Sequence, residues 1–391
     1  MSSARRRGLT AALICAIMFL ASIFEVQGAL LNDIIGYYGL ADSAQGLASA
    51  AVSAGAAAAL VSSFFLIGRL PKLLLLRISV LFCGVFLILL KIAVSFQLFI
   101  AIWLLIGIGM GYMDMLITSC MADLYEGRTA TRMMCLLHTA YGLMATLAPL
   151  IFFALMTGGL AWNSIYICLG IMGAAIFVLL FFTSGSLKGG TERGDSLKEQ
   201  RMTLRDMGTL LSGGTLPGLM AAVFFQGVFL GGMNTWISRY VGVTLGSALG
   251  SASLTAMFLG LMISRLTVPF LPVRPEKYVR TAGIAAGVVL LAALPFQNAY
   301  IMCAAVFVCG LAFGALLPCM LSLGCASAPG STMFATTVLM LALYAGQAIT
   351  PPVIGAMETA FGLRTGIALC AAAIILCSVS CMTARFPGYG D

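Results

Sequence analysis

Two acidic side chains stand inside long apolar runs of this sequence and are its first candidates for chemistry. Asp114 lies in IGMGYMDMLITS and Glu25 lies in FLASIFEVQGAL. A charged residue at the centre of a lipid-facing helix costs about 2.5–3.5 kcal/mol on insertion scales, so such residues mark candidate functional sites. Apolar surroundings disfavour an ionised carboxylate, which lets the group take up and release a proton near neutral pH. We predict that Asp114 couples protons and that Glu25 is a second site; the competing interpretation is an acid that only packs helices.

The few other polar side chains in these runs form a second group of candidates. His138 is the only histidine, and it could share the proton or bind a substrate hydroxyl, although a lone histidine on an apolar helix more often only packs. Amide groups beside an aromatic ring suit a polyhydroxylated or amide-bearing ligand, whereas hydrogen bonding between helices is the alternative. The predicted substrate-binding residues are Gln27, Asn32, Gln226, Asn234, Trp236 and Gln347. For Trp236, anchoring at the membrane interface is a competing role.

The elements that position these residues are predicted from composition. Of 391 residues, 61% are hydrophobic and 9% are charged, a balance that excludes a water-soluble domain of this length. A helix needs roughly 20 apolar residues to cross the bilayer core, and the runs are too long and too uniform for membrane β-strands. We therefore predict an all-α membrane protein with twelve transmembrane helices, over 9–35, 44–67, 73–93, 97–121, 132–156, 162–183, 217–238, 246–268, 279–296, 299–323, 332–357 and 363–383.

The basic residues predict the orientation of these helices. The formal net charge is +8, and 18 of the 21 basic residues fall on one side if the N-terminus is cytoplasmic, leaving only Lys91, Arg239 and Arg364 outside. Positive charge marks the cytoplasmic side, so we expect both termini to lie in the cytoplasm. This placement explains the charge without nucleic acid as a partner. We expect a multi-pass protein of the plasma membrane, in particular a bacterial inner membrane.

A polar stretch at the midpoint predicts two halves. We expect an N-terminal six-helix bundle over 1–185, a cytoplasmic linker over 186–212 and a C-terminal six-helix bundle over 213–391. Gly107 and Gly111 match Gly310 and Gly314 at an offset of 203, which indicates duplication. Two such halves are expected to rock against each other, exposing a site near the bilayer midplane alternately to each side.

Several kinds of chemistry find no support in the sequence. The twelve cysteines fall in apolar runs without a CxxC pair, which favours packing, and a single histidine disfavours a zinc site. No phosphate-binding GxxxxGK[ST] loop occurs, and no constellation of nucleophile, base and metal is visible. We predict no metal, no cofactor and no enzymatic activity.

Three segments carry a resemblance to a known family. They are GxGxxD ending at Asp114, LPCMLSLG from Leu317 to Gly324 and QAITPPVIG from Gln347 to Gly355. The chain resembles the fucose-permease-like branch of the major facilitator superfamily, whose members are proton-linked importers of sugars and related solutes. The resemblance implies a twelve-helix fold in two six-helix halves and a proton-linked acid at Asp114.

The same resemblance implies a cytoplasmic gate. GRLPKLLLLR from Gly68 is similar to the family's loop between helices two and three but lacks its acidic residue, and ADLYEGR from Ala122 is similar to the charged inner end of its fourth helix. The residues expected to take part are Gly68, Arg69, Asp123 and Arg128.

Together these features predict a secondary active transporter that takes up a small polar solute such as a sugar with protons by alternating access. The alternative is a proton-antiporting exporter of amphipathic drugs or metabolites, which the same fold supports and which the many methionine and phenylalanine residues also suit. A membrane-embedded enzyme and a sensor without net transport are further alternatives with less support. The expected partners are the solute, protons and the lipid bilayer, and we expect the protein to function as a monomer.

Overall fold

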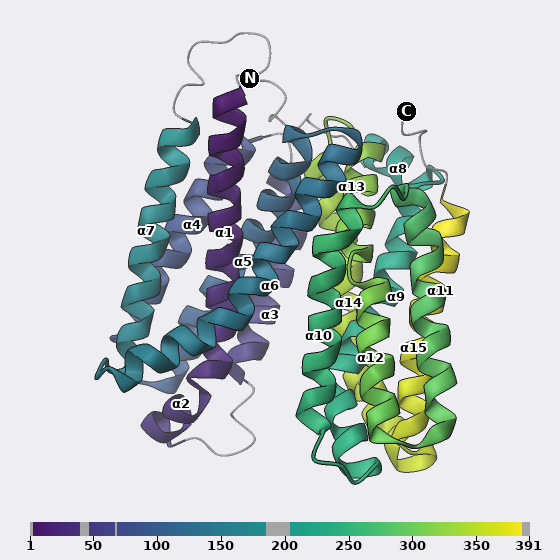
Figure 1. The fold of residues 1–391 in the computed structure, drawn as a ribbon. Coiled ribbons are helices and arrows are strands. Elements are labelled where there is room, and N and C mark those ends of the chain that lie inside the picture. The colour runs from purple at the N-terminus through teal and green to yellow at the C-terminus, as the bar shows by residue number, and fades with distance from the viewer. Residues whose placement is uncertain (1–2, 40–46, 67–68, 185–203, 385–391) are drawn as a thin grey trace. The chain divides into compact units, whose positions relative to one another are not determined.

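The computed structural model describes residues 3–39, 47–66, 69–184 and 204–384, and every regular element within these ranges is helical. Contacts divide the chain into two compact units (Figure 1). Unit 1 comprises Met1–Leu124 and Leu137–Arg201, and unit 2 comprises Tyr125–Leu136 and Met202–Asp391. The segment Tyr125–Leu136 therefore packs with the second half of the chain. The predicted boundaries of the two halves and of the linker at 186–212 stay a prediction.

Long apolar runs form the helices of unit 1, because a helix satisfies its backbone groups internally in a lipid environment. They are α1 (Ser3–Ala29), α2 (Leu31–Tyr38), α3 (Leu47–Leu66), α4 (Lys72–Leu90), α5 (Phe96–Leu124), α6 (Gly127–Thr157) and α7 (Ile165–Ser184). Unit 1 shares α6 with unit 2, since the first ten residues of this helix, 127–136, belong to unit 2.

Unit 2 continues with helices of similar composition. They are α8 (Leu204–Ser212), α9 (Leu216–Arg239), α10 (Gly250–Thr267), α11 (Pro275–Ala293), α12 (Ala299–Phe313), α13 (Leu316–Ser327), α14 (Thr332–Phe361) and α15 (Leu363–Thr383). Most of the predicted linker lies outside the described residues, and its last nine residues form α8.

Eleven helical segments of the described chain are long and apolar enough to cross a membrane, which makes this a multi-pass membrane protein. They fall on eleven of the predicted spans. The remaining span, 44–67, corresponds to the shorter apolar helix Ala50–Leu66, and part of it lies outside the described residues. The count of twelve therefore stays a prediction, as does the cytoplasmic placement of both ends.

Two spans differ in detail from their predicted outline. The first begins at Ser3 rather than at residue 9 and is interrupted after Ala29, although backbone bonds from Leu30 N to Val26 O and from Ile34 N to Leu30 O continue across the junction at 3.0 Å. The seventh runs beyond its predicted end as a π-helical turn, Tyr240–Thr244. Hydropathy detects the apolar run but not such local changes in hydrogen-bond pattern.

Glycines set the closest helix contacts in both units. In unit 1, α3 packs on α5, and a Cβ at Gly107 would collide with the carbonyl oxygen of Val52. In unit 2, α10 packs on α12, and a Cβ at Gly310 would collide with the carbonyl oxygen of Met257. Only glycine allows backbones to approach this closely. The two glycines that match at an offset of 203 thus occupy corresponding contacts, as a duplicated unit requires.

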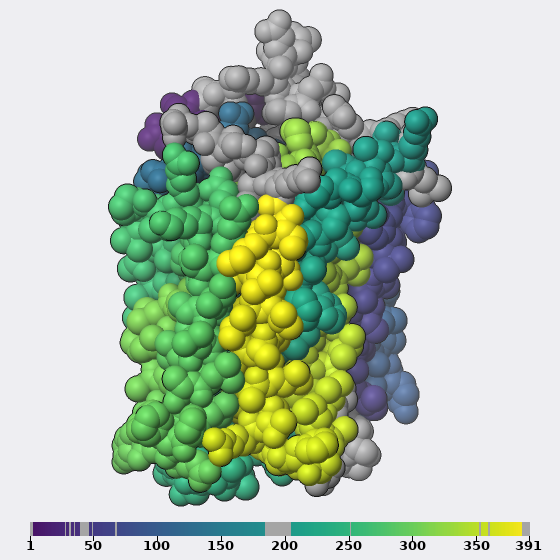
Figure 2. All heavy atoms as spheres, turned by 90° about the vertical axis from the view of Figure 1, so that its right-hand side faces the viewer, coloured from purple at the N-terminus to yellow at the C-terminus, as the bar shows by residue number. Residues whose placement is uncertain are grey.

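The packing of unit 2 centres on α9, which contacts α14 and α15. Figure 2 shows α15 in yellow, running along one face of this unit with α11 on one side and α9 on the other. Gly227 and Gly346 bring the backbones of α9 and α14 together, since a Cβ on either would collide with a carbonyl oxygen of the facing helix. These contacts place the polar residues of α9 and α14 close to one another.

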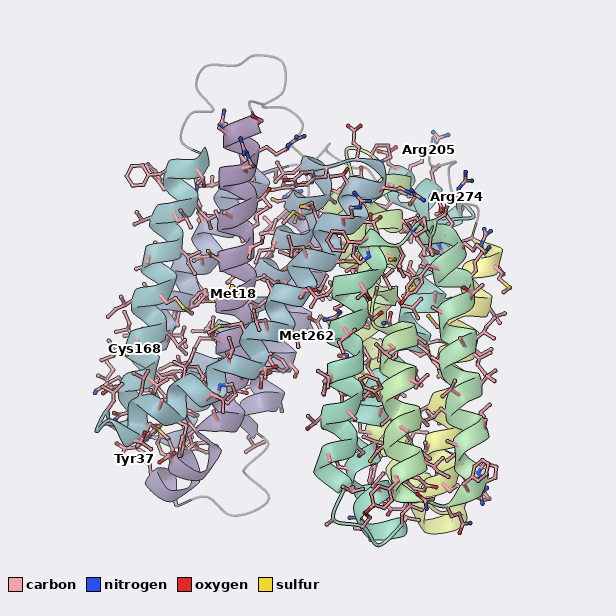
Figure 3. The ribbon with its side chains drawn as sticks, viewed as in Figure 1. Met18, Tyr37, Cys168, Arg205, Met262 and Arg274 are labelled. Atoms are coloured by element: carbon pink, nitrogen blue, oxygen red, sulfur yellow. The ribbon has the colours of Figure 1, made fainter. Side chains whose placement is uncertain are left out.

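Aromatic side chains hold α2 against the rest of unit 1. The ring of Tyr38 lies 5.3 Å from that of Phe99 on α5, and its Oη donates a 2.6 Å hydrogen bond to Ala93 O. Trp103 and Tyr166, both fully buried, continue the cluster to α7 with ring centroids 6.2 Å apart. Figure 3 places Tyr37 in α2 at the end of unit 1 opposite to the start of α1.

Candidate functional site

The predicted proton-coupling acids lie on two helices of unit 1 that pack together. Asp114 is in the second half of α5, partly exposed between the buried Met113 and Met115, and it is the only acidic or basic side chain of α5 before Asp123. Glu25 is partly exposed near the end of α1, which contacts α5. Asp114 is therefore accessible although the residues next to it in the chain are buried, whereas Glu25 lies between the exposed Phe24 and the buried Val26.

Tyr112 and Ser62, which were not predicted, form a polar contact between α5 and α3. Their hydroxyl oxygens are 2.7 Å apart, which joins α5 to α3 by a hydrogen bond two residues before the acid. A hydroxyl pair can donate to or accept from a polar ligand. Sequence reasoning could have found it only by pairing a serine of one span with a tyrosine of another, and nothing in the local spacing signals that pairing.

His138 and the polar residues predicted in the first span lie on three different helices, α6, α1 and α2. His138 is buried in α6, with 7% of its surface exposed, beside the buried Thr139. Gln27 is partly exposed near the end of α1. Asn32 belongs to α2, but its side chain lies outside the described part of the structure. The role predicted for each of these residues stays a prediction.

In unit 2 the structure brings two predicted amides onto facing helices. Gln226 on α9 is only 1% exposed, and its Oε1 is buried with no hydrogen-bond partner among the described residues. Gln347 lies on α14 within the region where α9 approaches closely, because a Cβ at Gly231 would sit 2.7 Å from the Gln347 carbonyl oxygen. A buried acceptor without a partner costs about 1–3 kcal/mol, so Gln226 either bonds a ligand or water, or lowers stability.

The far end of α9 is bound to α14 by a different set of contacts. Trp236 Nε1 donates a 3.2 Å hydrogen bond to Pro351 O, and the guanidinium of Arg239 lies 6.0 Å from the Trp236 ring centroid. Arg239 also pairs with Glu358 at 3.0 Å. The indole N–H therefore already has a partner within the protein, which supports the anchoring role more than the ligand role. Asn234 is exposed on the same helix.

A buried ion pair lies at the start of α4. Lys72 Nζ is 2.7 Å from Asp123 Oδ2, and the two side chains are only 2% and 7% exposed. The predicted gate residue Asp123 thus fixes the end of α5 to the start of α4. Lys72 was not among the predicted site residues, and its position directly after a proline in GRLPK was the available signal. Of the other gate residues, Arg69 and Arg128 are exposed, and Gly68 lies outside the described residues.

The first turns of α6 are held by contacts inside unit 2. The hydroxyl oxygens of Thr131 and Ser322 are 3.0 Å apart, and Arg132 Nε donates to Pro269 O at 2.9 Å. Figure 3 shows Arg205 and Arg274 at one common end of this unit. Arg205 lies in the first turn of α8 and Arg274 directly precedes α11, so these two helices begin at that end.

The described residues contain no group of three or more histidine, cysteine, aspartate or glutamate side chains arranged to hold a metal ion. The polar groups that are present are carboxylates, amides and hydroxyls on apolar helices. Such groups exchange protons and hydrogen-bond a neutral solute.

Comparison with known proteins identifies the fold and the family. The chain aligns over most of its length with a crystal structure of the E. coli fucose:proton symporter FucP (TM-score 0.69, 16% identity, 96% of this chain and 98% of that one). It aligns equally widely with the proton:xylose symporter XylE (TM-score 0.76, 13% identity, 97% and 95%) and with the human organic anion transporter MFSD10 (TM-score 0.75, 14% identity, 97% and 100%). No curated protein sequence gives a significant match. The family model described as Major Facilitator Superfamily matches residues 11–333, and the chain belongs to this superfamily of membrane transporters.

Proposed function

We propose that this chain is a secondary active transporter that takes up a small polar solute, such as a sugar, together with protons by alternating access. The observation that carries the proposal is the position of Asp114, a partly exposed acid among apolar residues of α5. An acid in such a place costs free energy, so its presence there favours a functional role over packing alone.

The driving force of one proton is sufficient for this role. A charge that moves down 100 mV releases about 2.3 kcal/mol. Since each 1.4 kcal/mol corresponds to a factor of ten, one proton supports a solute gradient on the order of 50-fold. A single titrating carboxylate is enough, with Asp114 as the primary site and Glu25 and His138 as secondary groups.

The amide groups support a neutral, hydrogen-bonding solute. Gln226 offers a buried acceptor without a partner among the described residues, and Gln347 lies on the facing helix. We assign them to solute binding together with Gln27, Asn32 and Asn234. Trp236 contributes less directly, by fixing α9 to α14 through its bond to Pro351.

An exporter that exchanges protons for amphipathic compounds is the second candidate. Its support is the comparably strong structural likeness to an organic anion transporter, which shows that the fold alone does not select sugars. The two candidates differ in the sign of coupling: import moves solute and proton together, and export moves them in opposite directions.

The test uses proteoliposomes that contain a pH-sensitive dye and are exposed to sugars, glycosides, amino acids and amphipathic compounds. Acidification with a sugar that Asp114→Asn abolishes, while Asp206→Asn on the exposed surface of α8 leaves it intact, supports the proposed importer. Proton movement only with amphipathic compounds would select the exporter. Solute uptake without any proton signal would remove the coupling role of Asp114.

We further propose a plasma-membrane location with both termini in the cytoplasm. The Lys72–Asp123 pair, with Arg69, Arg128 and the adjoining Gly68, would then form the cytoplasmic gate. A cysteine-accessibility assay from each side of the membrane tests this orientation.

A further inference from the structure

A groove on unit 1 lies outside the candidate transport residues. It has a volume of about 480 Å³ and runs between α4 and α7, with a lining that includes Leu81, Val85 and Phe177. Arg77 is its only charged lining residue. The volume is within the range of about 300–1,000 Å³ seen for small-molecule sites.

The groove exists because α4 and α7 cross at glycines. A Cβ at Gly84 would lie 3.2 Å from the Gly170 carbonyl oxygen, and one at Gly173 would lie 3.2 Å from Gly84 Cα. Helices that touch at small residues separate on either side of the crossing. The groove occupies this wedge, toward the start of α4 and the end of α7, where Phe177 and Phe181 follow Gly173 by one and two turns.

The apolar wall of this groove faces outward from unit 1. Ile78, Val85 and Phe181 are 50%, 47% and 51% exposed, a pattern that lipid contact explains and water contact does not. In a membrane protein this surface is in contact with lipid acyl chains.

Arg77 gives the groove a charge preference. It lies five residues after the start of α4, about 7.5 Å into the helix at 1.5 Å per residue, and its guanidinium is 5.3 Å from the Phe181 ring centroid. A long side chain at this depth directs its charged end toward the headgroup region. A guanidinium has five N–H donors and binds phosphate with two parallel hydrogen bonds.

We propose that this groove binds an acidic phospholipid, whose phosphate pairs with Arg77 and whose acyl chain lies along the apolar wall between α4 and α7. An acidic headgroup fits because it brings a net negative charge, whereas a zwitterionic headgroup brings its own cation to neutralise the phosphate. The predicted cytoplasmic location of this end of α4 agrees, since basic sites between helices on that side attract anionic lipids.

The experiment compares lipid retention on the full-length protein by native mass spectrometry after exchange into mixed micelles of phosphatidylglycerol and phosphatidylcholine. The wild-type protein is expected to retain phosphatidylglycerol preferentially. Arg77→Gln should reduce that retention roughly tenfold or more, the effect of losing charge-assisted hydrogen bonds, and leave phosphatidylcholine unchanged. Arg205→Gln on α8 is the matched control for the loss of one positive charge and should retain the preference.

A second variant keeps the test independent of the stability of Arg77→Gln. Leu81→Trp fills the groove while Arg77 stays in place, and it should lower retention of both lipids. Equal retention of the two lipids by the wild-type protein, an unchanged preference in Arg77→Gln, or unchanged retention of both lipids in Leu81→Trp would overturn the proposal. Lipid binding is measured without solute, so its outcome is separate from that of the transport assay.

Discussion

Removing one partner of the buried pair between Lys72 and Asp123 should destabilise the protein strongly. The atoms are 2.7 Å apart and the side chains are only 2% and 7% exposed, so neither charge can be solvated when the other is lost. Breaking a buried pair in this way costs about 3–5 kcal/mol, whereas replacing both members with apolar groups is often close to neutral. Lys72→Met alone should therefore lose about 3–5 kcal/mol, and the double variant with Asp123→Leu should recover most of that loss.

The assay is a double-mutant cycle on the free energy of unfolding in detergent micelles. The exposed pair between Arg239 and Glu358, at 3.0 Å with exposures of 54% and 27%, is the matched control. Arg239→Met should cost no more than about 1 kcal/mol, because solvent screens that pair. The reasoning is refuted if Lys72→Met costs no more than Arg239→Met, or if the double variant is as unstable as the sum of its two single variants.

Two further variants follow from close contacts and from the unpartnered amide. Gly107→Leu should prevent the packing of α3 on α5, and it should lower the yield of folded protein in size-exclusion chromatography. Gly142→Ala on α6, where a Cβ meets nothing within 4 Å, should instead gain up to about 1 kcal/mol; equal behaviour of the two variants would contradict the glycine argument. Gln226→Leu removes a buried acceptor without a partner among the described residues, so it should leave the free energy of unfolding unchanged or raise it by about 1–3 kcal/mol. Solute uptake should fall in the same variant, and unchanged uptake would remove Gln226 from the proposed solute site.

The helices could largely be predicted from sequence because lipid imposes one strong rule, a long apolar run. That rule predicted the extent of the last span, Leu363–Thr383. The close contacts at Gly107 and Gly310 come only from the structure, since the sequence related these two glycines by their spacing alone. The rule could not reveal the interruption after Ala29, since the apolar run continues on both sides of the junction.

Partnerships between side chains were harder to predict than helices. Lys72 and Asp123 are 51 residues apart, and the hydroxyls of Ser62 and Tyr112 are 50 apart, so no local period relates them. Trp236 was predicted to bind a ligand, and only the structure shows that its indole N–H already donates a hydrogen bond to the carbonyl oxygen of Pro351. Hydropathy identifies the segments that can lie in lipid, but it does not tell which polar side chains form hydrogen bonds or ion pairs with one another.

The first turns of α6 have a consequence for fragments of this protein. The residues Tyr125–Leu136 pack with the second half of the chain, where Thr131 meets Ser322 and Arg132 meets Pro269. If the polypeptide were cut in the central linker, this segment would stay on the amino-terminal piece. Its packing partners, which include Ser322 and Pro269, would be on the carboxy-terminal piece. Neither piece expressed alone would then bury the surfaces that this segment covers, whereas coexpressed pieces could reassemble through it.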